Sequence, residues 1–420
     1  MKTVLLAVTV FVTFTLSARA DRLVQPNDVV AIAGDSITAQ HLYSAFMEDY
    51  LLMCQPTQGQ KVVQFGWSGE QAPAFLARLD TDVFPFKPTV VTTCYGMNDG
   101  HYVALNDDTK NAYRTAQIAI VEAFKKKGVR VIVLGSSKCV DFTFFPSGLV
   151  TPEGYNATLG AFASIDQEIA AKEGVVYADV FGTTLEVMKK AKAQFGTNYV
   201  FAGPDGIHPF PNGHLVMAYT FLKALGYDGK IGTITVDYGT SQASGSPGQE
   251  IVSCRAGVVD VKSTRYPFCF SGTPDSRDPN TTAAIATVFP FNDDLNRYLL
   301  VVKGIHTAKA KVTWGRVSKE YTAANLARGV NLAADFLVNP FVEQFNKVNL
   351  AVQLQETQET VLFQTFMHSK TEWLKTYAPQ SGAALDQLIA TGMAQHDLLY
   401  QQAADLVIPI EHTIKIEPEN

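Results

Sequence analysis

The sequence is poor in positive charge, in cysteine and, beyond its first twenty residues, in long apolar runs. Its 420 residues carry a formal net charge of −6 at pH 7, whereas a nucleic-acid partner calls for a basic surface. The five cysteines lack the spacing of a metal site. No later segment is long and apolar enough to cross a bilayer. These features disfavour a nucleic-acid-binding protein, a cysteine-ligated metal protein and an integral membrane protein.

The odd number of cysteines means that at least one thiol is free or pairs with another chain. Cys254 and Cys269 flank a segment rich in predicted strands, and a disulfide between them fits an exported protein. Two small buried thiols explain the same pair equally well. Cys94 lies within an apolar run and is predicted to be a core residue.

The first twenty residues have the pattern of a signal peptide. Lys2 precedes an apolar run over residues 4–16, and Ala18-Arg19-Ala20 supplies an Ala-x-Ala cleavage pattern. An uncleaved anchor is the alternative, but the run is shorter than an ordinary membrane span. We predict cleavage after Ala20 and a secreted or periplasmic location. Removal of Lys2 and Arg19 takes the net charge from −6 to −8.

Between residues 28 and 226, short apolar runs alternate with longer amphipathic ones. The predicted strands are residues 29–33, 62–65, 89–95, 129–134 and 175–180. The predicted helices are residues 40–53, 70–79, 108–127, 155–172, 184–194 and 213–225. Strands that alternate with helices form a parallel sheet covered on both faces. The sequence therefore predicts a three-layer α/β/α domain over residues 21–228.

The pattern changes after residue 227. Residues 237–249 are rich in Gly and Ser and are predicted to be a loop or linker. Strand-like runs at 258–261, 298–302 and 309–314 predict a small β-rich accessory module over residues 229–335. Asn339-Pro340 can begin a helix. Helical patterns to about residue 370 and over 383–406 predict a C-terminal helical region, residues 336–420, whose tail at 407–416 can return to a sheet as a strand.

Four short motifs lie at the ends of predicted strands or in loops of the first domain. The first, Gly34-Asp35-Ser36-Ile37-Thr38, ends the first strand. Motifs at the carboxyl ends of parallel strands meet at one edge of the sheet. A serine there is lifted clear of the sheet, but its hydroxyl is a poor nucleophile unless a base takes its proton. Taken alone, the motif is more typical of a helix N-cap.

Two further motifs can supply hydrogen-bond donors to an oxyanion. Gly69, in the loop 66–70 after the second strand, can bring its backbone N–H close without side-chain hindrance. Asn98, in 96–99 after the third strand, can donate through its side-chain amide; one such donor is worth roughly 3–4 kcal/mol of transition-state stabilisation. Ordinary turn residues are the alternative, and Asp99 is expected to bind nearby backbone.

The fourth motif, residues 205–209, precedes the last helix of the domain. The carboxylate of Asp205 can bind one ring nitrogen of His208 and leave the other free to accept a serine proton. A lone histidine is usually a surface or core residue, but a carboxylate three residues earlier favours catalysis. No site role is assigned to three other histidines near the motifs, His41, His101 and His214.

The ordered set of motifs resembles the SGNH hydrolase (GDSL esterase/lipase) superfamily over roughly residues 28–226. The resemblance implies a flavodoxin-like α/β/α fold with a Ser36 nucleophile and a triad completed by Asp205 and His208. It also implies an oxyanion hole formed by the Ser36 N–H, the Gly69 N–H and the Asn98 amide. No metal or organic cofactor is required by that chemistry.

The sequence departs from the family pattern just after the first motif. Many members have a glycine there, and this chain has Ala39-Gln40-His41, so substrate preference cannot be transferred from any one member. Export and the accessory module favour removal of O-acetyl groups from a carbohydrate, with an acylated small molecule or polysaccharide as substrate. A lipase or acyl-thioesterase, an O-acyltransferase and a glycan-binding protein with a vestigial site are the alternatives. Residues 229–335 are expected to brace the C-terminal helices rather than bind a ligand, and the oligomeric state stays open.

Overall fold

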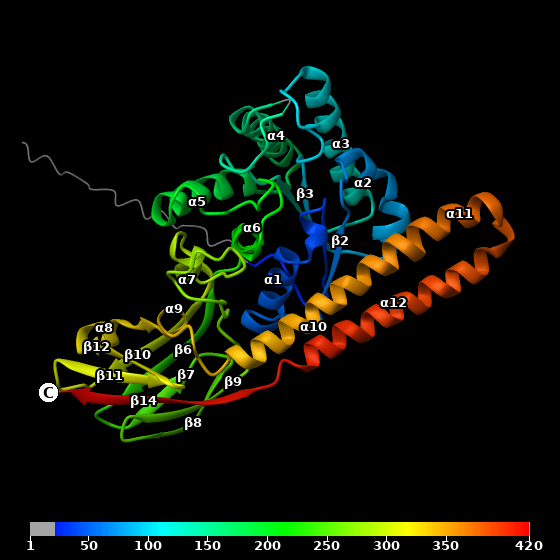
Figure 1. Ribbon diagram of the computed structural model, residues 1–420. Coiled ribbons are helices and arrows are strands. Elements are labelled where there is room, and N and C mark those ends of the chain that lie inside the picture. The colour runs from blue at the N-terminus through cyan, green and yellow to red at the C-terminus, as the bar shows by residue number, and fades with distance from the viewer. Residues whose placement is uncertain (1–21, 149, 420) are drawn as a thin grey trace, which may run out of the picture.

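The computed structural model describes residues 22–148 and 150–419 (Figure 1). The predicted signal peptide, residues 1–20 with its cleavage site after Ala20, lies outside the described residues. Among the helices of the described residues, none has the length and apolar character needed to cross a membrane.

The first domain is built on a parallel sheet of five strands in the order β2-β1-β3-β4-β5. The strands are β1 (Val29–Gly34), β2 (Lys61–Gly66), β3 (Val90–Tyr95), β4 (Val131–Ser136) and β5 (Val176–Ala178). Every residue of β3 and β4 is buried, as expected for parallel strands covered on both faces. The winding reverses at β1, which lies between β2 and β3. Ligand sites of such sheets form at the carboxyl ends of the strands beside that reversal.

Helices cover both faces of this sheet. Their bounds are α1 (Tyr43–Asp49), α2 (Ala72–Arg78), α3 (Asp107–Lys126), α4 (Pro152–Glu173), α5 (Val180–Phe195) and α6 (Pro211–Ala224). Alternation along β1 sends Val30 and Ile32 into one core, with α1, α5 and α6, and Ala31 and Ala33 into the other, with α2 and α3. The predicted three-layer flavodoxin-like α/β/α fold is confirmed.

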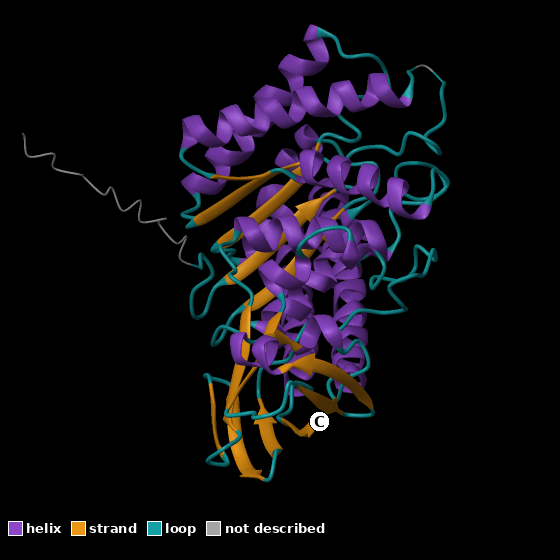
Figure 2. Cartoon of the chain, turned by 90° about the vertical axis from the view of Figure 1, so that its left-hand side faces the viewer, coloured by secondary structure: helices purple, strands orange, loops and turns teal. Residues whose placement is uncertain are grey.

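The β-rich module contains two sheets below the first domain in Figures 1 and 2. Their strand orders are β13-β10-β6-β7 and β12-β11-β14-β9-β8. The strands are β6 (Lys230–Asp237), β7 (Gln242–Gly245), β8 (Gln249–Arg255), β9 (Val258–Ser263), β10 (Arg297–Lys303), β11 (Lys309–Trp314), β12 (Val317–Thr322), β13 (Val330–Asn331) and β14 (Ile410–Glu419). The short helices α7 (Phe291–Leu295), α8 (Ala323–Arg328) and α9 (Leu332–Asp335) pack around β10.

The prediction that residues 237–249 form a loop or linker is wrong for residues 242–245, which form a strand, whereas the residues between the strands form turns. β7 runs through this segment and pairs antiparallel with β6. Its Gly and Ser content reflects close backbone approach, because a Cβ on Gly245 would lie 1.9 Å from the Gln249 carbonyl oxygen. Cys254 and Cys269 are free thiols and do not form the disulfide offered as one alternative. Cys269 is buried and Cys254 is partly exposed.

The C-terminal region forms a helical hairpin and a strand. The first arm is α10 (Val342–Thr360), continued by a π-helical segment, Val361–Ser369, and by α11 (Lys370–Tyr377); the second arm is α12 (Gly382–Asp405). The chain then enters β14, which pairs with β9 and β11 as the tail was predicted to do. The region predicted as 336–420 is thus divided between a hairpin on the first domain and a central strand of the β-rich module.

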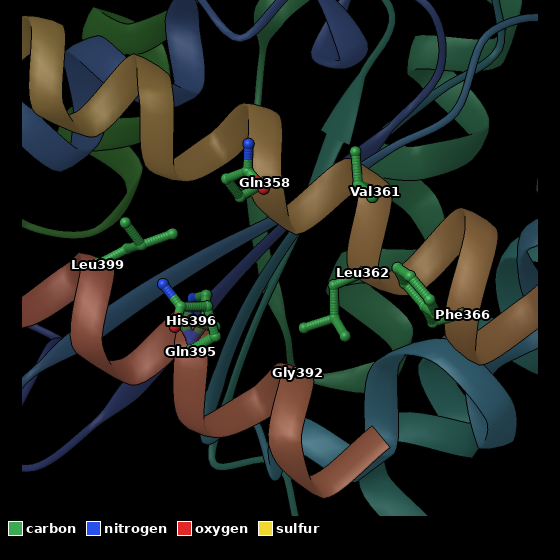
Figure 3. Close-up of a pocket in the computed structure, with 8 residues that line it drawn as sticks. All are labelled: Gln358, Val361, Leu362, Phe366, Gly392, Gln395, His396 and Leu399. Carbon is green, nitrogen blue, oxygen red and sulfur yellow. The ribbon is translucent and has the colours of Figure 1, made fainter. Parts of the chain in front are cut away.

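The two arms of the hairpin are locked together at the π-helical segment. Figure 3 shows Leu362 of the first arm facing Gly392 of α12. A Cβ on Gly392 would lie 2.2 Å from Leu362 Cδ1, so glycine allows this approach without displacing the Leu362 side chain. His396 of α12 places its Nε2 2.8 Å from Glu359 Oε1 of α10. A cavity of about 120 Å³ between the arms is lined by Leu362, Phe366, Gly392 and His396, among others.

Candidate active site

Ser36 lies in the turn that joins the end of β1 to a short 3₁₀ turn, Thr38–Gln40. A Cβ on Gly34 would lie 2.1 Å from Thr38 Oγ1, so the turn folds back closely on the strand end. Asp35 and Ile37 are buried on either side, and the Ile37 N–H donates to Asp35 Oδ1 at 2.9 Å. Ser36 itself is half-buried. The turn therefore presents one side chain, the Ser36 hydroxyl, at the rim of the sheet.

The structure brings the three predicted triad side chains into one hydrogen-bonded chain. Ser36 Oγ lies 2.7 Å from His208 Nε2, although the two residues are 172 positions apart. The other ring nitrogen, His208 Nδ1, lies 2.6 Å from Asp205 Oδ2. Asp205 Oδ1 accepts the backbone N–H groups of Ile207 and His208, both at 2.9 Å.

The electrostatics of Asp205 favour its ionised form. Partial burial acts to raise the pKa of Asp205, but the hydrogen bond to the His208 ring and those from two backbone N–H groups outweigh it and leave the pKa below its ordinary value. An ionised Asp205 holds a proton on Nδ1 of the neutral imidazole. Nε2 is then the unprotonated nitrogen and can accept a proton from Ser36.

Two glycines fix the loop that carries Asp205 and His208. Gly203 and Gly206 have φ of 80° and 73°, which side-chain-bearing residues rarely adopt. A Cβ on Gly203 would lie 1.8 Å from the His208 carbonyl oxygen. The Gly206 carbonyl oxygen accepts the N–H of Asp141 at 2.9 Å, which ties the loop to the segment after β4.

Gln40 joins the nucleophile turn to this loop, and sequence analysis missed it. Its Nε2 donates to the Pro209 carbonyl oxygen at 3.2 Å, and its Oε1 lies 3.1 Å from His214 Nε2. His214 is buried and accepts the Tyr43 N–H on Nδ1, so it packs behind the site. A glutamine four positions after Ser36 has no distinctive sequence pattern, and only the fold brings it to Pro209.

The two other predicted donors, Gly69 and Asn98, are linked through Glu70. Gly69 is exposed, has φ of 76°, and has no atom within 4 Å of an added Cβ. Asn98 donates through Nδ2 to the Glu70 carbonyl oxygen at 3.0 Å and accepts the Tyr102 hydroxyl on Oδ1 at 3.1 Å. This contact uses one of the two N–H bonds of the amide.

The carboxylates of Glu70 and Asp99 hold the two donor-bearing segments in place through hydrogen bonds to buried side chains and backbone N–H groups. The Glu70 carboxylate receives Arg78 Nε at 2.6 Å and Arg78 Nη2 at 2.7 Å, and it accepts the Tyr95 hydroxyl at 2.8 Å. Asp99 accepts the N–H groups of Ala72 and Gly96 at 2.9 and 3.0 Å. Asp99 therefore binds nearby backbone, as predicted.

Two buried charged groups near the nucleophile were not singled out by the sequence. Burial raises the pKa of Asp35 to about 7, with the Ile37 N–H opposing and the carboxylates of Asp99 and Glu70 adding to the shift. Lys138, in the segment after β4, is also buried; its Nζ donates to the Cys139 carbonyl oxygen at 2.8 Å, and burial lowers its pKa. Neither group bonds directly to the triad.

Phe145, in the segment after β4, packs behind the site. Phe145 is buried, and its ring lies 5.5 Å from that of Tyr155 and 6.3 Å from that of Tyr102. Because the Tyr102 hydroxyl binds Asn98, this stack supports the Asn98 side chain. Within the described residues, no group of three or more His, Cys, Asp and Glu is arranged to hold a metal ion.

Comparisons with known proteins agree with this architecture. Residues 32–216 match the profile of the GDSL-like lipase/acylhydrolase family. None of the curated proteins compared with the chain matches it. A solved structure of a gut microbial diltiazem-metabolizing enzyme is 21% identical, with a TM-score of 0.73, and covers 95% of this chain and 100% of its own. At that identity the likeness shows a shared fold, which takes in the β-rich module and the hairpin.

Two shorter structures match about half of the chain. An acetylxylan esterase from Geobacillus stearothermophilus is 20% identical with a TM-score of 0.41, over 49% of this chain and 97% of its own. An α/β hydrolase from the metagenome of Lake Arreo, Spain, is 22% identical with a TM-score of 0.41, over 49% and 98%.

Proposed function

Since residues 32–216 belong to the GDSL-like lipase/acylhydrolase family, the protein is a carboxylic ester hydrolase, and we propose that Ser36, His208 and Asp205 are its catalytic triad. One observation carries the proposal: the unbroken chain of contacts from Ser36 Oγ through the His208 ring to the Asp205 carboxylate, at 2.7 and 2.6 Å. Both distances lie within hydrogen-bond range, so the proton path is in place before any substrate binds.

In the first step, Ser36 Oγ attacks the carbonyl carbon of the ester while His208 Nε2 takes the hydroxyl proton. The imidazolium that forms is stabilised by the ionised Asp205 carboxylate on Nδ1. The carbonyl π-electrons move to the oxygen and produce a tetrahedral oxyanion. Collapse of this intermediate expels the alcohol, which receives its proton from His208 Nε2, and leaves an acyl group on Ser36.

In the second step, water replaces the alcohol. His208 Nε2 takes a proton from water as its oxygen attacks the acyl carbon, and the second tetrahedral intermediate releases a carboxylic acid and the Ser36 hydroxyl. As that intermediate collapses, His208 Nε2 gives the water proton to Ser36 Oγ. The sum is hydrolysis of one ester bond: the original Ser36 proton leaves with the alcohol, a proton from water replaces it, and the enzyme returns to its starting state.

The oxyanion is held, in this proposal, by the Ser36 N–H, the Gly69 N–H and the Asn98 amide. Within residues 22–148 and 150–419, neither backbone N–H donates a hydrogen bond, so both are available to a ligand. Donors that are fixed before reaction stabilise a developing charge without a reorganisation cost.

The proposed substrate is a carbohydrate that carries O-acetyl groups, met outside the cell after cleavage at Ala20. The catalytic side chains lie at an open rim, because the side chain of His208 is 38% exposed and that of Asp205 47% exposed. A large alcohol portion such as a sugar chain can stay outside the protein while its small acetyl group reaches Ser36. Preference for long acyl chains would contradict this substrate, and transfer of the acyl group to an acceptor sugar instead of water would contradict hydrolysis.

The test uses the full mature chain and two alanine variants. Ser36→Ala is expected to abolish acetate release from p-nitrophenyl acetate and from acetylated polysaccharides, with an unchanged circular dichroism spectrum. Ser164→Ala, which removes an exposed hydroxyl on α4, is the matched control and should keep full activity. Turnover retained in Ser36→Ala would refute the nucleophile assignment. A profile over acetyl to octanoyl esters decides the acyl preference.

A further inference from the structure

The C-terminal hairpin lies outside the family match but runs along β2, the edge strand of the catalytic sheet. The Gln64 N–H of β2 donates to Glu359 Oε2 at 2.8 Å, so a hairpin side chain satisfies the open edge. At the amino end of β2, far from the site, Lys61 Nζ lies 2.6 Å from Asp397 Oδ1 of α12. These two contacts tie the hairpin to β2, and Figure 1 shows the hairpin passing beside that strand.

Thr360, the last residue of α10, joins the nucleophile turn to the loop 66–70. Its Oγ1 lies 2.9 Å from His41 Nε2 and accepts Gln64 Nε2 at 2.8 Å. Gln64 Oε1 in turn accepts the Gly66 N–H at 2.8 Å. One hairpin hydroxyl thus contacts the residue that follows the Ser36 turn and, through Gln64, the first residue of the Gly69 loop.

His41 occupies a backbone position that favours glycine. Its φ of 56° and ψ of 36° are left-handed, a conformation that is strained for a residue with a Cβ and free of strain for glycine. His41 belongs to the stretch 39–41, where the sequence departs from the family pattern. The side chain present here reaches the hairpin, and a glycine could not make that contact.

The π-helical segment after Thr360 contacts the loop 66–70 directly. Gln364 Nε2 donates to the Gly66 carbonyl oxygen at 3.3 Å. The Trp67 ring lies 5.0 Å from that of His368 and 6.1 Å from that of Phe363. Gly66 itself is pressed against the nucleophile turn, since a Cβ there would lie 2.3 Å from the Ala39 nitrogen. π-helical segments recur at functional sites because they change which side chains face a neighbour.

A chain of polar contacts leads from the hairpin to Asn98. His368 Nδ1 lies 3.2 Å from Asp82 Oδ2 without hydrogen-bond geometry, and Asp82 Oδ2 lies 3.5 Å from Arg78 Nη1. Arg78 holds the Glu70 carboxylate, and the Glu70 carbonyl oxygen receives the Asn98 amide. The side chains of Arg78, Glu70 and Asp82 are at most 4% exposed, so this chain is little screened by solvent.

A pocket of about 290 Å³ lies beside the loop, lined by Trp67, Gly69, Arg78 and His368 among others. An added Cβ on Gly69 would have no described atom within 4 Å, so side-chain packing does not fix this residue. The position of the Gly69 N–H therefore depends on a few polar contacts.

From these contacts we infer that the C-terminal hairpin positions the oxyanion hole. Thr360, Gln364 and His368 are positioning residues: they hold the loop 66–70 and, through Glu70, the Asn98 amide in register with Ser36. The inference rests on the proposed roles of Ser36, Gly69 and Asn98. An oxyanion donor acts only within about 2.7–3.1 Å of the developing charge, so a small displacement slows the chemical step more than it weakens substrate binding.

The test compares three variants of the full chain by kcat and KM on p-nitrophenyl acetate. Thr360→Val keeps the side-chain shape and removes the hydroxyl; we expect kcat to fall about 3–10-fold with KM nearly unchanged. Thr360→Ser keeps the hydroxyl and should restore kcat to within about twofold of wild type. Asp397→Asn breaks the exposed contact at the other end of the hairpin and should leave both constants unchanged.

His41→Gly removes the other partner of the Thr360 contact. Glycine suits the left-handed backbone at this position, so the change removes only the imidazole side chain. We expect an unchanged or higher thermal midpoint together with the same loss of kcat as in Thr360→Val. The inference would be overturned if Thr360→Val and His41→Gly both kept wild-type kcat, or if Asp397→Asn lost as much kcat as they do. A change in KM alone would overturn it too. Ser36→Ala in the same assay separates the two failures: residual turnover there refutes the proposed triad, whereas an inactive Ser36→Ala beside an unaffected His41→Gly refutes only the positioning role.

Discussion

Two groups of acidic side chains in this molecule have pKa values shifted in opposite directions, and the contrast shows which surroundings keep a carboxylate ionised. Asp205, at the rim, is 47% exposed. The carboxyl cluster, formed by Glu48 and Asp49 of α1 with Glu356 of α10, is fully buried. The pKa of Asp205 lies below its ordinary value, whereas burial raises the pKa of Glu48, Asp49 and Glu356 well above theirs.

The partners of each group explain the difference. Asp205 receives an imidazole N–H and two backbone N–H groups while it keeps contact with solvent. In the cluster, Ser44 donates to Glu356 at 2.6 Å and Asn349 to Asp49 at 2.6 Å, and these single neutral donors do not offset the loss of water. The same chemical group is thus an ionised orienting residue at the rim and a neutral packing group between α1 and α10.

The largest expected effect comes from exchanging a carboxylate for an amide in each group. Asp205→Asn should lower kcat by about 10⁴-fold, because an amide stabilises the wrong tautomer of His208 while the geometry is kept. Asp49→Asn is the matched change in the carboxyl cluster and should leave kcat within about twofold of wild type, since an amide resembles the neutral acid. Initial rates on p-nitrophenyl acetate measure both, and equal losses in the two variants would remove the functional distinction between them.

A smaller loss of kcat is expected when the mutation removes an oxyanion donor instead of the Asp205 carboxylate. Asn98→Ala removes one proposed oxyanion donor and should reduce kcat about 10²–10³-fold with little change in KM. Its loss should also appear in acetate release from a polysaccharide, because the donor acts on the acyl group that both substrates share. A variant that raises KM and leaves kcat intact would assign Asn98 to substrate binding instead.

The sequence was informative where the determinants are local and uninformative where they are distant. β1 was predicted at 29–33 and observed at Val29–Gly34, because a run of small apolar residues ending in glycine encodes a buried strand by itself. The four motifs also pointed to one rim, since parallel strands bring their carboxyl ends together. Gln40 and Thr360 were missed because their contacts are made with residues about 170 and 320 positions away, on elements whose placement no local pattern encodes.

The β-rich module illustrates the same limit. The Gly- and Ser-rich composition of 237–249 predicts a loop or linker, but the segment holds β7, paired with β6, and tight turns. The tail is predicted as a strand that returns to a sheet, yet the place of β14 between β9 and β11 follows from the path of the hairpin. Composition indicates local backbone flexibility, but it does not indicate which strand a segment pairs with.

The smallest expected effect lies in the carboxyl cluster and concerns stability rather than rate. The pKa of Glu48 is raised in the folded protein, first by burial and then by the neighbouring carboxylates of Glu359 and Glu356. Below the ordinary pKa, 4.5, both folded and unfolded chains carry the proton and the residue adds no pH dependence. As the pH rises above that value, the unfolded chain releases the proton and the folded chain keeps it, so folding becomes less favourable until the folded pKa is reached.

Glu48→Gln removes this titration and keeps the contact with Gln355 Nε2, which lies 3.0 Å from Glu48 Oε1. At pH 8 the variant should melt about 2–4 °C above wild type, equivalent to roughly 1 kcal/mol, and at pH 4 the two midpoints should coincide. Thermal unfolding followed by circular dichroism at both pH values measures the difference. A variant that melts below wild type at pH 8 would show that Glu48 is ionised and paired in the folded protein, which would place the cluster in the same class as Asp205 and end the contrast between the two regions.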